Sequence, residues 1–198
     1  MSNNNAIAIV ILAAGSSSRM KTIKQLLPWK GSTFLGHTIQ VAKASLAQDV
    51  YVVLGANADQ IILECNKHSV NYLVNKVWQE GMGTSIACGV KHLLQTKKPY
   101  TGVLILLCDQ PFINTDYINK LIIAYKKSPK NSIATKYKHG VGVPALFSQA
   151  SFKELSLLSQ DFGAKDILRK EENQRIDILP NFDTTDIDTE KSYNLLNF

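Results

Sequence analysis

A turn of small residues followed by two cations is the part of this sequence best suited to chemistry. The turn Gly15–Ser18 comes directly after a wholly apolar run, and Arg19 and Lys24 follow it, five positions apart. Small residues let backbone N–H groups approach phosphate oxygens, and two nearby cations can neutralise a triphosphate. The two best-known glycine-rich phosphate motifs are absent, because Gly15 lacks the second glycine that both require. The segment predicts phosphate binding, and a loop with solvated charges is the alternative.

A carboxylate follows a second apolar run. Asp109 comes directly after Leu104–Cys108, and an ionised carboxylate at the end of a buried strand needs a cation or a metal as its partner. Mg²⁺ is commonly held by one or two carboxylates together with substrate phosphates. We therefore predict that Asp109 binds Mg²⁺ or Mn²⁺. The alternative, a cap for the next helix, is disfavoured because we expect that helix to begin near Asn114, beyond Pro111.

A third segment, Asn75–Ser85, leads from a short strand into a helix. Its glycines and the start of the helix suit contacts to a ribose or an anion. An ordinary connection between a strand and a helix would look similar. The prediction that this segment contacts a ligand is therefore supported only if the fold brings it beside the other two segments.

The surrounding pattern predicts the elements that position these residues. Continuous β-branched runs indicate strands buried on both faces, at Ala6–Ala13, Asp49–Leu54 and Gly102–Cys108, with Asn71–Asn75 as a shorter strand. Helical periodicity predicts helices at Thr33–Ser45, which Ser32 would cap, and at Ala58–Lys67, Thr84–Gln95 and Tyr117–Lys127. This alternation predicts a three-layer, Rossmann-like α/β fold, whose mostly parallel central sheet has helices on both faces. In such sheets ligands bind beyond the carboxyl ends of the strands.

The pattern changes in the last third of the chain. Two runs separated by Lys138–Gly140 predict a hairpin of Ile133–Tyr137 and Val141–Phe147. Short helices are expected at Ser151–Leu158, Gly163–Lys170 and Thr189–Leu196, and a late strand at Ile176–Leu179. No linker or repeat divides the sequence, so we expect one domain spanning residues 1–198.

Composition narrows the class of protein. The 198 residues are 45% hydrophobic and 19% charged, which excludes a disordered chain. The net charge of +6 indicates an anionic partner without identifying it. The longest apolar run, Ala6–Ala14, is too short to span a membrane, and no lysine or arginine precedes it as in a secretory signal. Cys65, Cys88 and Cys108 form no C-x-x-C pair, so we expect reduced thiols and a cytoplasmic protein.

Together these motifs resemble those of the nucleotidyltransferases that act on the molybdenum cofactor. The opening motif is Leu12-Ala-Ala-Gly-Ser-Ser-Ser-Arg-Met, followed by Lys24-Gln-Leu-Leu-Pro28. The later motifs occur in the family's order: Asn75 to Ser85, Asp109-Gln-Pro111, Gly142-Val-Pro-Ala-Leu-Phe147, Asp161-Phe-Gly-Ala164 and Asp186-Ile-Asp-Thr189. The resemblance covers nearly the whole chain. Ala13-Ala14-Gly15 is similar to the cytidylyl-transferring branch, whereas guanylyl-transferring members usually carry a second glycine at position 14.

The resemblance implies a nucleotidyltransferase fold, a substrate and a set of roles. The reaction would transfer CMP from CTP to the terminal phosphate of molybdopterin and release pyrophosphate, with Arg19, Lys24 and Asp109 as catalytic residues. Asp109 and Asp188 would bind the metal. The expected nucleotide-binding residues are Leu12, Ala13, Ala14, Gly15, Ser16, Arg19, Lys24, Gly81 and Ser85. Residues 1–130 would form the nucleotide-binding half and residues 131–198 the acceptor half.

The chain departs from the family pattern at a few positions. Lys21 stands where glycine is usual, Gln160 and Lys165 replace a glycine and an arginine, and Ser192 replaces an acidic residue. Two alternatives remain: an enzyme of the same fold that acts on a sugar or polyol phosphate or uses GTP, and a non-catalytic factor that delivers cofactor to a molybdenum hydroxylase. A nucleic-acid partner is disfavoured, because the lysines form short pairs rather than a long stripe.

Overall fold

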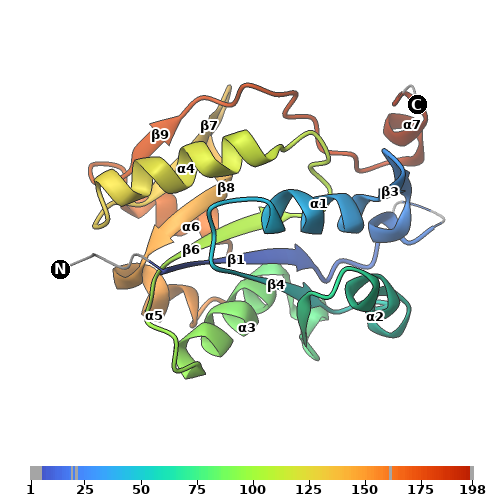
Figure 1. Ribbon diagram of the computed structural model, residues 1–198, viewed down its shortest axis with the longest axis horizontal. Coiled ribbons are helices and arrows are strands. Elements are labelled where there is room, and N and C mark those ends of the chain that lie inside the picture. Colours follow the sequence, from blue (N-terminus) through green and yellow to red (C-terminus); the bar gives the residue numbers. More distant parts are fainter. Residues whose placement is uncertain (1–5, 19, 21, 161, 197–198) are drawn as a thin grey trace.

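The computed structural model describes residues 6–18, 20, 22–160 and 162–196, so Arg19, Lys21 and Asp161 lie outside the described residues. Its centre is a seven-stranded sheet in the order β5-β4-β1-β6-β8-β7-β9 (Figure 1). The strands are β1 (Ala6–Ala13), β4 (Asp49–Leu54), β5 (Asn71–Val74), β6 (Tyr100–Leu107), β7 (Ile133–Tyr137), β8 (Gly140–Ser148) and β9 (Ile176–Ile178). Four neighbouring strands, β5, β4, β1 and β6, are parallel, as the buried β-branched runs predict.

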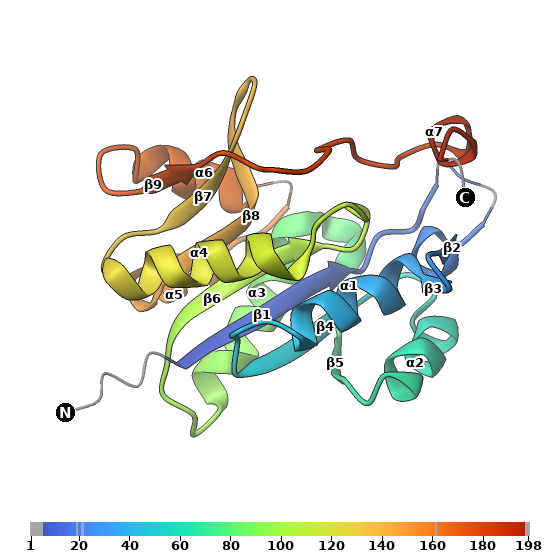
Figure 2. The same ribbon diagram turned by 45° about the horizontal axis from the view of Figure 1, so that its top comes forward.

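Helices cover both faces of this sheet, which confirms the three-layer α/β prediction (Figure 2). One face packs against α1 (Phe34–Lys43), α2 (Ala58–Lys67) and α4 (Thr115–Lys127). The other packs against α3 (Met82–Gln95), α5 (Phe152–Leu155) and α6 (Ala164–Lys170). β1 shows the reason: Ile7, Ile9 and Ile11 point into the first layer, whereas Ala8 and Val10 point into the second. Successive side chains of a strand face opposite sides, so a central strand must be apolar throughout.

The parallel register brings several strand ends together at one edge of the sheet. Leu12 of β1 pairs with both Val53 of β4 and Leu107 of β6. The residues that follow β1 and β6 therefore leave the sheet side by side. Cys108 continues the alignment, because its backbone N–H donates to the Leu12 carbonyl over 3.3 Å.

The last third of the chain extends the sheet with the predicted hairpin. β8 lies antiparallel to both β6 and β7, and β9 adds in parallel beside β7. The closing helix is α7 (Glu190–Asn194). The predicted helix at Ser151–Leu158 is shorter than expected: a 3-10 turn, η3 (Gln149–Ser151), takes its first residue, and α5 already ends at Leu155, where a turn follows.

Two local expectations were wrong. Thr33, not Ser32, caps α1, since its side chain accepts the Gly36 N–H over 2.8 Å while Ser32 pairs within a small hairpin. That hairpin, of β2 (Pro28–Trp29) and β3 (Ser32–Thr33), did not appear among the predicted elements. The second wrong expectation is the end of the strand before Asp109: β6 ends at Leu107, so Asp109 follows the strand by two residues rather than directly.

A small apolar cluster outside the main core joins this hairpin to the end of the chain. The satellite cluster consists of buried Leu27, Trp29, Phe34 and Ile187, with Met20, Phe112, Tyr193 and Leu196 packed against them. Tyr193 donates a hydrogen bond from its hydroxyl to the Pro28 carbonyl over 3.0 Å. The backbone N–H of Ile187 donates to the Asp109 carbonyl over 3.2 Å. The C-terminal segment is thereby held over the edge where β6 ends.

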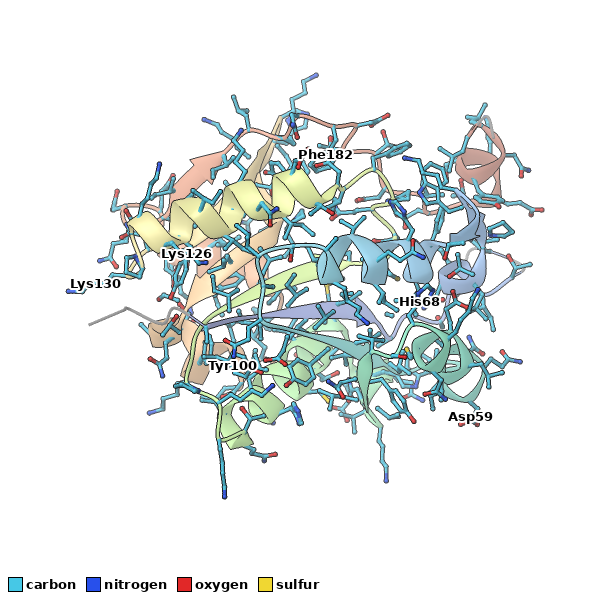
Figure 3. The ribbon with its side chains drawn as sticks, in the orientation of Figure 1. Asp59, His68, Tyr100, Lys126, Lys130 and Phe182 are labelled. Atoms are coloured by element: carbon cyan, nitrogen blue, oxygen red, sulfur yellow. The ribbon has the colours of Figure 1, made fainter. Side chains whose placement is uncertain are left out.

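The lysines at the end of α4 and the three cysteines lie as the sequence analysis expected. Lys126 and Lys130 are exposed and point outward at the end of α4, as expected for solvated charges (Figure 3). All three cysteines are free thiols, with Cys65 and Cys108 buried and Cys88 partly so. Burial raises the pKa of Cys65 to about 11. Within the described ranges, every helix is too short or too polar to cross a membrane.

Candidate active site

A cavity of about 350 Å³ opens beyond the carboxyl ends of β1 and β6. It contains every described residue that the sequence analysis assigned to the site: Leu12, Ala13, Ala14, Gly15, Ser16, Lys24, Gly81, Ser85, Asp109 and Asp188. Arg19 lies outside the described residues. Segments widely separated in the sequence thus meet in one cavity.

Lys24 lies between two carboxylates in this cavity. Its Nζ is 3.0 Å from Asp109 Oδ2 and 2.8 Å from Asp188 Oδ1. The lysine side chain is only 12% exposed, compared with 25% for Asp109 and 39% for Asp188. Burial lowers the pKa of Lys24, but the two carboxylates outweigh this effect, and the net result is a raised pKa. The ammonium is therefore charged at neutral pH.

The two carboxylates also suit a divalent cation. Asp109 Oδ1 is buried and has no hydrogen-bond partner among the described residues. Asn114, not Asp109, caps α4, because its side chain accepts the Tyr117 N–H over 2.9 Å. The described residues contain no group of three or more His, Cys, Asp or Glu side chains that could hold a metal ion. A pair of carboxylates nevertheless fits Mg²⁺ or Mn²⁺, since these ions take further ligands from water and phosphates.

The small-residue turn forms the wall beside Lys24. Gly15 and Ser16 are exposed to the cavity, and Ser17 adopts a left-handed backbone conformation with φ of 55°. The Ser17 hydroxyl oxygen accepts the backbone N–H of Lys24 over 3.0 Å. This bond fixes the start of the 3-10 turn η1 (Lys24–Leu26) against the loop. The loop and the lysine are consequently one structural unit.

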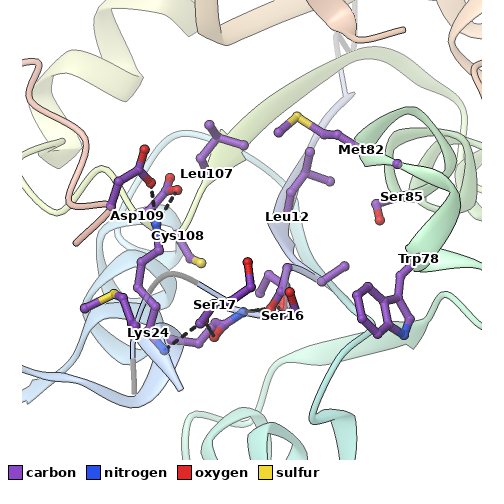
Figure 4. Close-up of a pocket in the computed structure, with 18 of the residues that line it drawn as sticks. Leu12, Ser16, Ser17, Lys24, Trp78, Met82, Ser85, Leu107, Cys108 and Asp109 are labelled. Carbon is purple, nitrogen blue, oxygen red and sulfur yellow. Dashed lines mark hydrogen bonds and ion pairs between the residues drawn. The ribbon is translucent and has the colours of Figure 1, made fainter. Parts of the chain in front are cut away.

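The opposite wall comes from the Asn75–Ser85 segment. Figure 4 shows Trp78, Met82 and Ser85 across the cavity from Lys24 and Asp109, with Leu12 between the two groups. Buried Asn75 donates its side-chain N–H groups to Thr84 Oγ1 over 2.8 Å and to Ser85 Oγ over 3.0 Å. The start of α3 is thereby fixed beside the cavity.

A second cavity of about 490 Å³ adjoins the first. The two share Leu12, Met82 and Leu107. Its other walls come mainly from the β7–β8 hairpin and the start of α6, and exposed Lys138 and Lys165 also line it. Gln110 donates from Nε2 to Asp186 over 3.0 Å at this site. Burial raises the pKa of Tyr137 in its lining to about 12, so this phenol stays neutral.

Sequence reasoning did not assign Gln25, Trp78 and Met82 to the site, although all three occur in the quoted motifs. All three line the first cavity, and Gln25 does so from beneath the small-residue turn. A signal for Gln25 was available: it is a polar residue inside the predicted phosphate-binding motif, and its neighbours Leu26 and Leu27 are apolar. Trp78 and Met82 are apolar, and their residue types carry no such signal.

The family model for the MobA-like NTP transferase domain matches residues 9–176. Among curated proteins, the chain is 30% identical over 126 residues to nicotine blue oxidoreductase of Paenarthrobacter nicotinovorans, with 63% of this chain and 60% of that protein covered. It is 34% identical to the bifunctional protein GlmU of Stutzerimonas stutzeri, with 59% of this chain covered but only 25% of that protein. It is 27% identical to the purine catabolism protein PucB of Bacillus subtilis, with 94% of each chain covered.

Solved structures show the same architecture. Rv0371c from Mycobacterium tuberculosis superposes with a TM-score of 0.81 at 27% identity, covering 96% of this chain and 97% of that one. A structure of the same mycobacterial protein is a complex with manganese, with a TM-score of 0.77 at 26% identity, and covers the same shares. A nucleotidyl transferase from Methanothermobacter, Mth528, has a TM-score of 0.80 at 18% identity, with 97% and 96% covered. The chain therefore has the α/β nucleotidyltransferase fold, and it belongs to the MobA-like NTP transferase domain family.

Proposed function

We propose that this protein transfers CMP from CTP to the terminal phosphate of a molybdopterin-type acceptor and releases pyrophosphate. The observation that carries the proposal is the position of Lys24 between Asp109 and Asp188, in a cavity that adjoins a second one. Two joined cavities suit a reaction of two substrates. The choice of CTP rests on Ala14, where the guanylyl-transferring relatives usually carry glycine.

The first cavity would hold the nucleotide. The Gly15–Ser18 turn supports this assignment, because exposed small residues let backbone N–H groups reach phosphate oxygens. Arg19 would bind the β- and γ-phosphates and Lys24 the α-phosphate. Gly81 and Ser85 on the opposite wall would contact the ribose or the base, together with Leu12, Ala13, Ala14 and Ser16.

Catalysis would then come from positioning and charge. A phosphate oxygen of the acceptor attacks the α-phosphorus of CTP, and the bond to the bridging oxygen of pyrophosphate breaks. A phosphate monoester is nucleophilic near neutral pH, so no side chain has to act as nucleophile. Lys24 would stabilise the negative charge that develops on the transferred phosphoryl group. Bound Mg²⁺ or Mn²⁺ would neutralise phosphate charge, and Asp109 and Asp188 would hold it.

The second cavity would hold the acceptor, which makes residues 131–198 the acceptor half of one domain. Its lining includes Ile86, Ile105, Val141 and Val143. These apolar side chains would pack against a flat heteroaromatic ring, and the polar residues of the same lining, Gln110 and Lys165 among them, would bond its polar groups. We place the product in the cytoplasm, for delivery to a molybdenum hydroxylase.

Pyrophosphate release measured with CTP, GTP and ATP, with and without molybdopterin, tests this function. We expect release that requires both CTP and molybdopterin as well as a divalent cation. Pyrophosphate release with a sugar or polyol phosphate in place of molybdopterin would assign the protein to another substrate class. Binding of molybdopterin without any release would make it a non-catalytic delivery factor.

A further inference from the structure

Gln25 lies beneath the small-residue turn and uses both of its side-chain N–H donors there. Nε2 donates to the Ala13 carbonyl over 3.0 Å and to the Gly15 carbonyl over 2.8 Å. Its Oε1 accepts the Ser17 hydroxyl over 3.2 Å. The residue is only 3% exposed. One buried amide therefore contacts three residues of the five-residue stretch Ala13–Ser17.

These bonds decide which backbone groups the loop can present to the cavity. The Ala14 carbonyl, between the two that Gln25 holds, accepts the Ala56 N–H over 3.0 Å. Three consecutive carbonyl oxygens are thus turned toward protein donors. By contrast, the backbone N–H groups of Gly15 and Ser16 donate to no acceptor in the described part of the chain.

This difference matters for an anionic ligand. A carbonyl oxygen that faced a phosphate would repel it, whereas an N–H group attracts it and forms a hydrogen bond. A loop of small residues has many accessible conformations, and several would expose carbonyl oxygens. The Gln25 amide, a donor fixed behind the loop, selects the conformation that exposes N–H groups instead of carbonyl oxygens.

We propose that Gln25 is a positioning residue that holds the Ala13 and Gly15 carbonyl oxygens away from the nucleotide phosphates, so that the loop meets them with N–H groups. The role rests on the proposed function only in requiring that the first cavity binds a nucleotide. Gln25 borders the first cavity, but its amide atoms bond Ala13, Gly15 and Ser17, so we expect it to control nucleotide affinity through the backbone of the loop.

Two substitutions separate this role from simple filling of space. Gln25→Met keeps an unbranched side chain of similar length but removes both donors. Gln25→Glu keeps the shape and places a carboxylate against two carbonyl oxygens. A milder variant, Ser17→Ala, keeps both Gln25 donors but removes the bonds of the Ser17 hydroxyl to Gln25 Oε1 and to the Lys24 N–H, and it guards against loss of folding. Asn119→Ala is the matched control, because Asn119 also bonds a backbone group (Leu46 N–H, 2.8 Å) but lines neither cavity.

Nucleotide binding is measured by tryptophan fluorescence with CTP, GTP and ATP, since Trp78 lines the cavity and Trp29 is buried in the satellite cluster. For the nucleotide that the wild-type protein binds, we expect at least tenfold weaker binding for Gln25→Met and a larger loss for Gln25→Glu. Ser17→Ala should show a smaller loss, and Asn119→Ala none. In steady-state assays the KM for that nucleotide should rise while the KM for the acceptor stays constant.

Wild-type affinity in Gln25→Met would overturn the proposal. So would a loss seen only as fewer binding sites and a lower kcat with an unchanged nucleotide KM, since that pattern indicates a smaller folded fraction. If the wild-type protein binds a nucleotide but transfers nothing to molybdopterin, the proposed function fails, and the binding measurements still decide the role of Gln25. If it binds none of the three, both fail.

Discussion

Asp109 and Asp188 contact the same lysine, but the molecule supports them in different ways. Asp109 follows β6, a strand inside the sheet whose residues Val103–Leu106 are at most 1% exposed. Asp188 lies between β9 and α7 in a stretch without helix or strand. Its neighbour Ile187 anchors that stretch through the satellite cluster and a single backbone hydrogen bond to Asp109.

Because the two carboxylates are supported differently, the geometry of the site can be lost while the global fold stays stable. Asp109 lies two residues beyond a central strand of the sheet, whereas Asp188 depends on a small cluster that can open without unfolding the sheet. The molecule thus places one carboxylate rigidly and the other on an element of lower local stability. Damage to the second region should reduce activity while the fold stays intact.

The largest effect is expected at the rigid carboxylate. Asp109→Ala should reduce turnover by about a thousandfold or more, because a metal that bridges phosphates contributes several kcal/mol to catalysis. The circular dichroism spectrum should match that of the wild-type protein. Asp116→Ala provides a control, since Asp116 is exposed in the first turn of α4. Near-wild-type turnover in Asp109→Ala would remove the metal assignment.

A smaller effect is expected at the lysine that joins the two regions. Lys24→Ala should reduce turnover by about a hundredfold, a typical cost of removing one charged contact to the transition state. Lys21→Ala should cost less than Lys24→Ala, because glycine is usual at position 21 in the family pattern. Initial rates under saturating CTP would measure both. Equal losses in the two variants would contradict the special position of Lys24.

The smallest effect on rate, and the sharpest test of the comparison, is expected in the satellite cluster. Ile187→Ala should lower turnover by about tenfold, as local opening displaces Asp188, with little change in the global unfolding transition. Ile118→Ala is the matched substitution in the main core, where Ile118 is fully buried. It should cost about 2–5 kcal/mol of stability and leave the activity of the folded molecules unchanged. Denaturant unfolding and specific activity are measured for both variants. A loss of stability in Ile187→Ala together with a loss of specific activity in Ile118→Ala would contradict the comparison.

The sequence predicted the main sheet well because its signals are local. Eight consecutive apolar residues in β1, half of them β-branched, favour a strand buried on both faces, and the strand ends then bring Gly15 and Asp109 together. The choice between Ser32 and Thr33 as the α1 cap was not decidable from residue type, because both can cap a helix.

The support for Asp188 could not be predicted. The strands β2 and β3 have two residues each, too short to show any alternation. Ile187 stands between two aspartates in the sequence, and the cluster that it shares with Trp29 joins segments far apart in the chain. Only the folded structure shows that they form one cluster. Likewise, the motif marks Gln25 as unusual, but only the folded loop shows what its amide holds.

Transfer of label from α-³²P-CTP tests the central claim most directly. With molybdopterin and Mg²⁺, the account predicts that the label joins the acceptor through a diphosphate (phosphoanhydride) linkage and that one pyrophosphate is released per label transferred. The reaction should fall to background in Asp109→Ala. Label that stays in CTP, or that is recovered only as free CMP, would contradict transfer to the acceptor phosphate.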